Sequence, residues 1–193
     1  MEKIVAESDD RITIYDTEKK TYKKSVKANY KKRFRMFLGL KRCHGENAYY
    51  LSNLLKKNGI NTYEVISYDK FSYVTKEIEG TSLFSRIIRE KNNEEKTKYY
   101  LKEYMKIIRK ILDLNLYYTD FHLGNFIIDK DDKIYIIDID EMQDSWYYGV
   151  LKKFRVIKKL KRTLKNDEFE LKKYNIDFDA DEMFYKYIKK RES

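Results

Sequence analysis

The first part of the chain alternates apolar and polar residues with the period of two that is typical of β-strands. Further alternating runs occur before residue 80 and again after residue 125. Polar or glycine-containing turns separate neighbouring runs. The pattern therefore predicts strands at residues 3–7, 11–16, 21–26, 63–68, 71–77, 126–129 and 133–139.

Apolar residues spaced three or four positions apart predict the helices. The clearest repeat spans residues 93–114, and it places six apolar residues on one face: Leu101, Tyr104, Met105, Ile108, Ile111 and Leu112. A second helix is predicted at residues 45–57, where Asn58 and Gly59 form the stop. Helical spacing also occurs within the basic segment 27–42 and in the tail from residue 145, which ends in a short amphipathic segment at residues 183–188.

Strands dominate before residue 80 and helices dominate after it. This order favours an α+β protein of two lobes over a doubly wound sheet, in which strands and helices alternate. A chain of 193 residues is long enough for two small lobes. We expect a β-rich N-lobe at residues 1–79 and a mainly helical C-lobe at residues 80–193.

Composition narrows the class of protein. Apolar residues make up 42% of the chain and include 19 Tyr and 10 Phe, which argues against wholesale disorder despite 38% charged residues. No apolar run approaches the length of a membrane span, and the start, MEKIVAESDD, lacks the apolar core of a signal peptide. The single cysteine, Cys43, excludes an internal disulfide and a cysteine-rich zinc site. We expect a soluble cytoplasmic protein.

Positive charge is concentrated in the tail. The net charge is +10, which a biased genome composition alone could produce. However, residues 152–165 hold eight Lys or Arg and no acid, with Phe154, Ile157, Leu160 and Leu164 on one helical stripe. One interpretation is a helix packed on the lobe with a solvated basic face. The other, compatible with the first, is a basic amphipathic helix that binds an anionic membrane or a phosphorylated glycolipid, which would place the protein at the inner face of the cytoplasmic membrane.

The stretch 117–142 carries the candidate chemistry. A loop after the long helix presents Asp120, His122 and Asn125, and the next hairpin presents Asp138 between two isoleucines. An acid in an apolar strand is costly unless it is paired or metal-bound. A carboxylate that accepts the proton of an attacking hydroxyl, together with hard oxygen ligands for Mg²⁺, is what phosphoryl transfer requires. The alternative is that Asp120 and Asn125 are ordinary turn residues.

The segments "TDFHLGNFII" and "IYIIDID" resemble the D-x-H-x-x-N catalytic loop and the metal-binding Asp of bacterial lipopolysaccharide core sugar kinases, of the heptose(II) kinase type. "KKNGINTYEV" and "YVTKEIEGTSL" match that family in order and spacing, as the end of helix C, the following strand and the hinge. The resemblance covers most of residues 1–142. It implies a protein-kinase-like two-lobe fold with a reduced C-lobe, built from a catalytic loop at 117–125, a metal-binding hairpin at 126–140 and a basic helical tail at 145–193.

The resemblance implies ATP and Mg²⁺ as cofactors and a lipid-linked sugar as acceptor, namely a heptose of the lipopolysaccharide inner core. Asp120 would be the catalytic base, and Asn125 and Asp138 would be the Mg²⁺ ligands. His122 would support the loop.

The nucleotide-binding residues implied by the resemblance are Lys24 in "TYKKSV", Glu46 in "HGENAYYL" as its ion-pair partner on helix C, and Glu77 in the hinge. Lys23 is an alternative to Lys24, because a one-residue slip of a strand exchanges its faces. Glu46 has an alternative role as well, since an acid in the first turn of a helix is favoured by the helix dipole.

The chain departs from the family at three places. Tyr118 stands where relatives often have His, residues 8–10 (Ser-Asp-Asp) replace the glycine-rich loop, and Asp140 replaces the Gly of D-F-G, so no activation-loop switch is implied. We expect Asp140 to be solvated and His44 to be a surface residue.

Three functions are consistent with these features. The first is an ATP-dependent kinase of a lipid-linked sugar. The second is another small-molecule phosphotransferase of the aminoglycoside or choline kinase type, although the short basic tail does not suit a cationic acceptor. The third is a non-catalytic binder of nucleic acid or anionic membrane, against which the intact set of Asp120, Asn125 and Asp138 argues.

Overall fold

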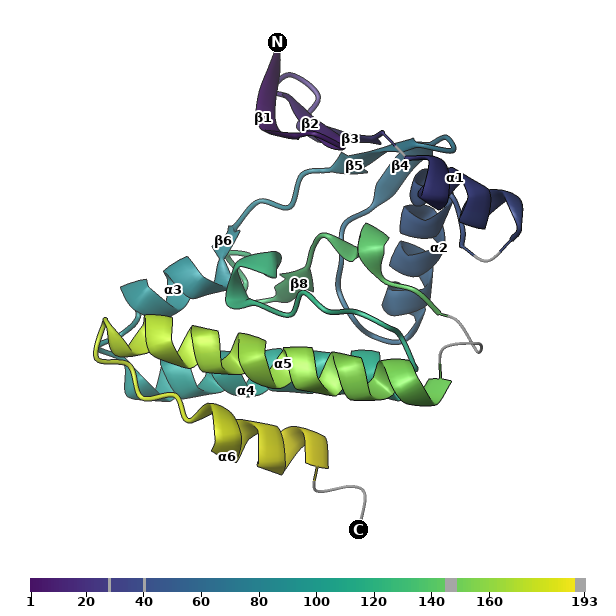
Figure 1. The fold of residues 1–193 in the computed structure, drawn as a ribbon. Helices are drawn as coiled ribbons and strands as arrows, with labels where there is room; N and C mark the ends of the chain where they lie inside the picture. The colour runs from purple at the N-terminus through teal and green to yellow at the C-terminus, as the bar shows by residue number, and fades with distance from the viewer. Residues whose placement is uncertain (28, 40, 145–148, 190–193) are drawn as a thin grey trace. The chain divides into compact units, whose positions relative to one another are not determined.

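The computed structural model describes residues 1–27, 29–39, 41–144 and 149–189. The chain divides into two compact units, whose elements are labelled in Figure 1. The first unit comprises Met1–Ile78 together with Asp138–Glu141, and the second comprises Glu79–Ile137 together with Met142–Ser193. The segment Asp138–Glu141 thus groups with the strands of the first part of the chain, although the sequence pattern assigns it to the C-lobe hairpin.

An antiparallel five-stranded sheet forms the body of the first unit. Its order is β1-β2-β3-β5-β4, so β3 occupies the centre and pairs with β5. Each predicted strand of this region is present, with ends displaced by at most two residues. The strands are β1 (Glu2–Ser8), β2 (Arg11–Asp16), β3 (Thr21–Val26), β4 (Val65–Tyr68) and β5 (Ser72–Lys76).

Two helices complete the first unit: α1 (Tyr30–Phe37) and α2 (His44–Lys57). Helix α2 packs against β4 and β5 and buries the predicted stripe of Ala48, Leu51 and Leu55. Gly45 allows this close approach, because a Cβ at that position would lie 2.1 Å from the Asp69 carbonyl oxygen and 2.3 Å from that of Ser72. The packing fixes which face of α2 points inward.

The long helix predicted at residues 93–114 is confirmed as α4 (Glu94–Asp113) in the second unit. The Asn93 side chain accepts the Lys96 amide hydrogen at 3.0 Å and caps the helix. The predicted hairpin forms β7 (Phe126–Ile128) and β8 (Ile134–Ile136), and β6 (Thr81–Ser82) joins them in the order β6-β7-β8. Helix α3 (Leu83–Arg89) has only two turns of apolar pattern, which the sequence analysis did not recognise.

The tail is helical as predicted. It forms α5 (Gly149–Lys172), α6 (Ala180–Phe184) and a final π-helical turn, η4 (Tyr185–Lys189). Residues 145–148 and 190–193 of the predicted tail lie outside the described residues. None of the helices within the described ranges combines the length and apolar character needed to cross a membrane.

Candidate active site

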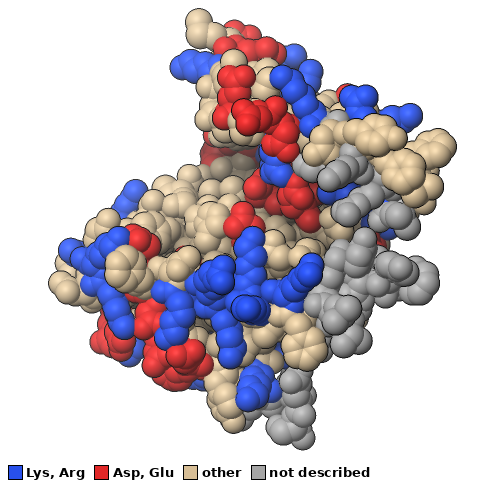
Figure 2. Space-filling view, viewed as in Figure 1, with Lys and Arg blue, Asp and Glu red and all other residues tan. Residues whose placement is uncertain are grey.

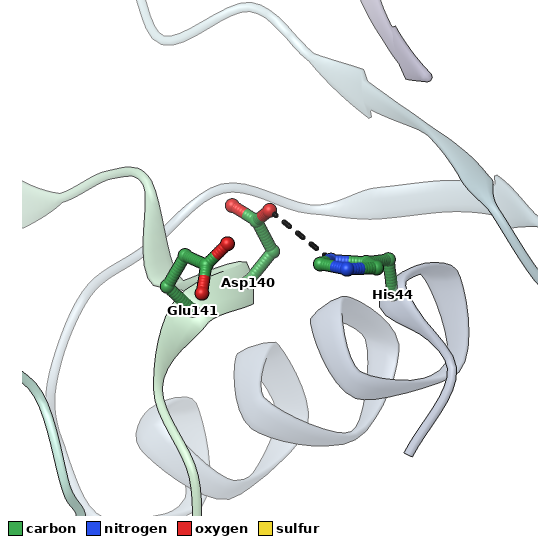
Figure 3. A group of neighbouring side chains, drawn as sticks. All are labelled: His44, Asp140 and Glu141. Carbon is green, nitrogen blue, oxygen red and sulfur yellow. Dashed lines mark ion pairs between the residues drawn. The ribbon is translucent and has the colours of Figure 1, made fainter. Parts of the chain in front are cut away.

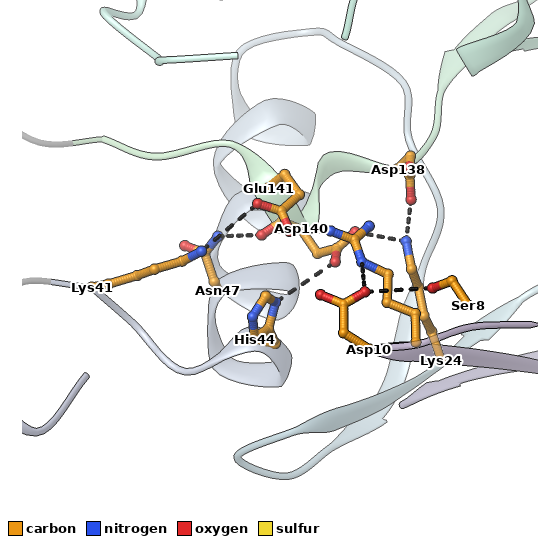
Figure 4. A network of polar contacts seen from close by, with 10 residues as sticks. Ser8, Asp10, Lys24, Lys41, His44, Asn47, Asp138, Asp140 and Glu141 are labelled. Atoms are coloured by element: carbon orange, nitrogen blue, oxygen red, sulfur yellow. Dashed lines mark hydrogen bonds and ion pairs between the residues drawn. The ribbon is translucent and has the colours of Figure 1, made fainter. Parts of the chain in front are cut away.

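In the first unit, the candidate residues Lys24 and Asp138 lie in one cluster with Asp140 (Figure 4). Lys24 projects from β3 in the centre of the sheet, and its Nζ contacts the Asp138 carboxylate and lies 3.0 Å from Oδ1 of Asp140. Lys24 and Asp138 are separated by 114 positions in sequence, so only the tertiary fold brings them together. The Lys23 side chain is exposed and lines a different pocket, with Asp69 and Lys70.

Asp138 does not lie in a strand. Strand β8 ends at Ile136, and Asp138 has a left-handed backbone conformation with φ of +60°. Asp is one of the few residues that adopt this region readily, because its short side chain bonds locally. The left-handed residue turns the chain out of the hairpin, and its carboxylate stays partly accessible, at 34% exposed. The predicted strand at residues 133–139 is therefore too long at its carboxyl end.

Two expectations about neighbouring residues are wrong. Asp140, expected to be solvated, and His44, expected on the surface, are both fully buried at 0% exposed. Asp140 is the middle residue of a short 3₁₀ turn, η2 (Ile139–Glu141), and this turn packs on the first turn of α2. Nδ1 of His44 lies 3.8 Å from Oδ2 of Asp140, and the Asn47 side-chain amide donates to the Asp140 carbonyl at 3.0 Å. Alternation in a short strand suggested a solvated face, but the chain leaves the strand before Asp140.

Asp140 is held in its charged form. Burial alone would raise the pKa of this carboxyl, but His44, Lys24 and Arg11 hold it below its usual range. Burial would likewise lower the pKa of Lys24, but Asp140 and Asp138 raise it above its ordinary value. Lys24 therefore remains a cation and Asp140 an anion at neutral pH, which keeps a fixed positive charge beside Asp138.

The expected ion pair between Lys24 and Glu46 is not formed among the described residues, and this assignment is corrected. Glu46 is exposed in the first turn of α2, on the wall of a surface pocket of about 470 Å³ that Arg42 and Tyr49 also line. The inward face of α2 presents His44 and Asn47 instead. The acids that contact Lys24 are Asp138 and Asp140.

Glu77, the expected hinge residue, follows β5 directly. Its Oε2 accepts a hydrogen bond from the Tyr15 hydroxyl at 2.8 Å, and its backbone amide donates to the Lys20 carbonyl at 2.9 Å. These contacts tie the end of β5 to the β2–β3 hairpin. The structure thus places Glu77 at the sheet, and nucleotide binding by Glu77 remains a proposal.

His44, Asp140 and Glu141 form a group whose ligand atoms lie within 4.8 Å of one another (Figure 3). Among the described residues, three buried atoms of this group have no hydrogen-bond partner: the two ring nitrogens of His44 and Oδ2 of Asp140. Fixed cations already balance the acids, since Arg11 contacts Glu141, Lys41 lies 3.8 Å from it, and Lys24 contacts Asp140. A divalent ion would have to compete with these three cations, so the group better suits positioning of Asp140 than metal binding.

In the second unit, the loop after α4 places Asp120 and Asn125. Asp120 is exposed, whereas Asn125 is buried at 8% exposed in a 3₁₀ turn, η1 (Leu123–Asn125). The Asn125 side-chain amide donates to the Asp120 carbonyl at 3.0 Å and to the Tyr118 hydroxyl at 3.3 Å. Because both donors point to the loop, Oδ1 is the atom of Asn125 left to face a ligand. Tyr118 thus anchors the loop through Asn125.

His122 acts on the loop backbone, as expected. Its Nδ1 accepts the Gly124 amide hydrogen at 3.1 Å, so the proton of the neutral ring is assigned to Nε2. Nε2 lies 3.8 Å from Oδ1 of Asp120. His122 therefore stabilises the turn and directs its Nε2 towards Asp120, the candidate base.

A buried network beneath the loop was not anticipated. The Tyr104 hydroxyl of α4 contacts the Phe121 carbonyl and lies 3.1 Å from Oδ2 of Asp167 on α5. Burial raises the pKa of Asp167 to about 7, although Tyr104 and the Leu123 amide act in the opposite direction. The sequence signal was the polar Asp167 on the buried stripe of α5, between Leu164 and Leu171.

No family model and no curated protein matches this sequence. Among solved structures, the chain is similar to the Rio2 kinase from Chaetomium thermophilum, in a complex with ADP/Mg²⁺ and phosphoaspartate, with a TM-score of 0.54 and 14% sequence identity. The match covers 85% of this chain and 54% of the Rio2 chain, so this chain spans about half of that kinase's length.

The chain therefore has the α+β, protein-kinase-like fold that the catalytic-loop motif implies. This likeness does not distinguish lipopolysaccharide core kinases from other members of the fold.

Proposed function

We propose that this protein transfers the γ-phosphoryl group of ATP to a hydroxyl group. The observation that carries the proposal is the contact of Lys24 with Asp138, because a half-buried lysine beside a partly accessible carboxylate is the arrangement that kinases use for phosphates and their metal ion. The kinase-like fold and the Asp120–Asn125 loop support the same conclusion.

The residues of the first unit suit nucleotide binding. Lys24 supplies a cation that Asp140 holds in place, and it would contact the α- and β-phosphates. The accessible carboxylate of Asp138 is a hard oxygen ligand of the kind that Mg²⁺ prefers. The second unit separately offers Oδ1 of Asn125, a ligand of the same kind. When bound, Mg²⁺ would neutralise charge on the phosphates.

The residues of the second unit suit activation of the acceptor. Asp120 is exposed and can accept the proton of an attacking hydroxyl, while its carbonyl is held by Asn125. We propose a sugar hydroxyl as acceptor, specifically a heptose of the lipopolysaccharide inner core. This finer assignment depends on the motif resemblance, whereas phosphoryl transfer depends on the fold and the side-chain geometry.

The test combines γ-labelled ATP and Mg²⁺ with the purified protein and a lipid extract from host cells that lack its gene. Parent protein should label the extract, and Asp120→Asn should lose at least about 100-fold in turnover while ATP affinity changes little, because general-base catalysis contributes about 10²–10⁴-fold. Asp113→Asn, an exposed acid at the end of α4, is the matched control and should retain full activity. Equal turnover in Asp120→Asn and parent would refute the assignment of the base.

The proposal also requires that Asp120 and Asp138 serve one reaction. Residues that act as a unit are strongly non-additive. The double variant Asp120→Asn/Asp138→Asn should therefore be little slower than the slower single variant. Multiplicative losses would indicate two independent roles.

Transfer to an aspartate is a second candidate, because the similar Rio2 complex contains phosphoaspartate. In that case label from ATP would appear on the protein itself and hydroxylamine would release it. Stable label on the lipid fraction, with none on the protein, would favour the hydroxyl acceptor.

A further inference from the structure

Helix α5 presents a strongly basic outer surface. Apart from Asp167, its inward side is apolar and includes Val156, Leu160, Leu164 and Leu171, all buried. Its outward side carries exposed Arg155, Lys158, Lys159, Lys161 and Arg162. The space-filling view shows Lys and Arg side chains gathered over this helix (Figure 2). The packing that stabilises the helix is thus complete without these cations.

Two large aromatic side chains lie on the same outward side. Phe154 is 72% exposed and Phe169 is 64% exposed. Fifteen residues separate them, which at 3.6 residues per turn leaves them about 60° apart around the helix and about 22 Å apart along it. Lys158 and Arg162 fall between them on this side. Together, Phe154, Arg155, Lys158, Arg162 and Phe169 form a surface that we call the α5 basic face.

The cations of the α5 basic face are not neutralised by the residues that the structure describes. In the part of the chain that the structure describes, Arg155, Lys158 and Arg162 have no acidic partner within ion-pair distance. Cations further along α5 differ, since Lys165 and Lys172 pair with Glu168 at 2.9 and 2.6 Å. Positive charge is therefore left available where the aromatic Phe154 is also exposed.

The basic side of α5 borders the catalytic loop in the same unit. Nζ of Lys159 donates to Oγ1 of Thr119 at 3.2 Å, and Thr119 immediately precedes Asp120. Asp120 is itself exposed. A ligand surface that contacts the outer side of α5 would thus lie next to the candidate base.

We propose that the α5 basic face docks on an anionic lipid surface. Cations without an acidic partner among the described residues supply the electrostatic attraction, and exposed Phe side chains at both ends supply apolar contacts at the headgroup boundary. A straight helix side about 22 Å long suits a flat surface. Duplex nucleic acid would use the cations, but its stacked bases offer no contact to Phe side chains spaced along one line, so the membrane is the occupant that the surface favours.

The docking also defines the acceptor class. This step rests on the proposed kinase function. Because Lys159 contacts Thr119, the acceptor hydroxyl belongs to a membrane-borne molecule and reaches Asp120 from the lipid surface. The docking itself requires no ATP, so the two proposals can fail separately.

The test is co-sedimentation of the full chain with phosphatidylcholine vesicles, with and without phosphatidylglycerol. Parent protein should bind only the anionic vesicles, and binding should weaken as salt rises, since the Debye length falls from about 10 Å at 0.1 M to about 3 Å at 1 M. The triple variant Arg155→Glu/Lys158→Glu/Arg162→Glu should lower the partition coefficient at least about 100-fold, because each basic residue lost near the surface removes about 1 kcal/mol of binding free energy.

A matched control removes equal charge elsewhere in the second unit. Lys91→Glu/Lys102→Glu/Lys130→Glu changes three exposed lysines and should keep at least half of the parent's binding. Phe154→Ser/Phe169→Ser should weaken binding even at low salt, because it removes only apolar contacts. Circular dichroism of each variant confirms that it is folded.

Three outcomes would overturn the docking proposal: no binding of the parent to anionic vesicles, equal losses in the two charge-reversed triple variants, or binding to duplex RNA with none to vesicles. Vesicle binding in a protein that does not turn over ATP would support docking and count against the kinase function alone.

Discussion

Oδ1 of the buried Asp140 lies 3.0 Å from Nζ of Lys24, so the acid that holds this lysine comes from the turn after the hairpin and not from helix α2. In the protein-kinase arrangement, a glutamate on helix C pairs with the lysine. Here α2 contributes indirectly, because Asn47 donates to the Asp140 carbonyl at 3.0 Å and His44 lies beside the Asp140 carboxylate. Asp140 and α2 together therefore position Lys24 against Asp138.

Substitution of Asp140 and of Glu46, the two candidate partners of Lys24, in separate variants should distinguish their roles. Asp140→Asn removes a buried charge that Lys24 contacts, so we expect a loss of about 1–3 kcal/mol in the free energy of unfolding and a higher KM for ATP. Glu46→Gln changes an exposed side chain and should stay within about 0.5 kcal/mol of the parent. Urea denaturation and steady-state kinetics provide the measurements. Greater sensitivity to Glu46→Gln would restore the helix glutamate as the partner.

Loss of the Asp138 charge should act on metal-dependent binding. Asp138→Asn is the suitable change because Asn also tolerates the left-handed backbone at this position. We expect it to weaken ATP binding in the presence of Mg²⁺ at least about tenfold more than metal-free binding, since it removes a ligand charge. Isothermal titration calorimetry with Mg²⁺ and with EDTA tests this. Equal losses under both conditions would indicate that Asp138 serves only as a partner of Lys24.

The Tyr104 hydroxyl should stabilise the loop that presents Asp120. Tyr104→Phe leaves the Phe121 carbonyl and Asp167 without this donor in a buried site, so we expect unfolding to become easier by about 1–3 kcal/mol. Because Phe121 adjoins Asp120, turnover should fall while the KM for ATP stays unchanged. Tyr185→Phe is the control, since that side chain is 61% exposed, and it should be neutral. A Tyr104→Phe variant with the activity and stability of the parent would show that the Tyr104 hydroxyl does not stabilise the loop.

Asp167 should make stability depend on pH. Its folded-state pKa is about 7, raised by burial, whereas an unfolded Asp titrates near about 3.9. Between these values the folded state binds the extra proton, so the contribution of Asp167 to stability falls as pH rises from about 4 to about 7 and is constant above that range. Asp167→Asn should remove this part of the slope. Urea denaturation across this pH range measures the slope of stability against pH. The same slope in the parent and the variant would contradict the assignment.

The sequence alone determined most of the elements, and its motifs led to the class of chemistry that we propose. Alternation placed the strands of the first sheet, and the repeat from Leu101 to Leu112 placed α4, because these patterns reflect burial of one face of each element. The loop from Asp120 to Asn125 was recognisable because its residues are close in sequence and their spacing sets the turn. The eight cations of residues 152–165 were equally visible in the sequence.

Only the tertiary structure decided which side chains meet. The selection of Lys24 over Lys23 depends on the face of β3, which the pairing of β3 with β5 fixes and strand parity does not. The burial of Asp140 and His44, and the exposure of Glu46, depend on how α2 is rotated on the sheet, which the close contact at Gly45 determines. The Tyr104–Asp167 contact joins residues 63 positions apart. Such contacts follow from packing between distant segments, and no local pattern in the sequence records them.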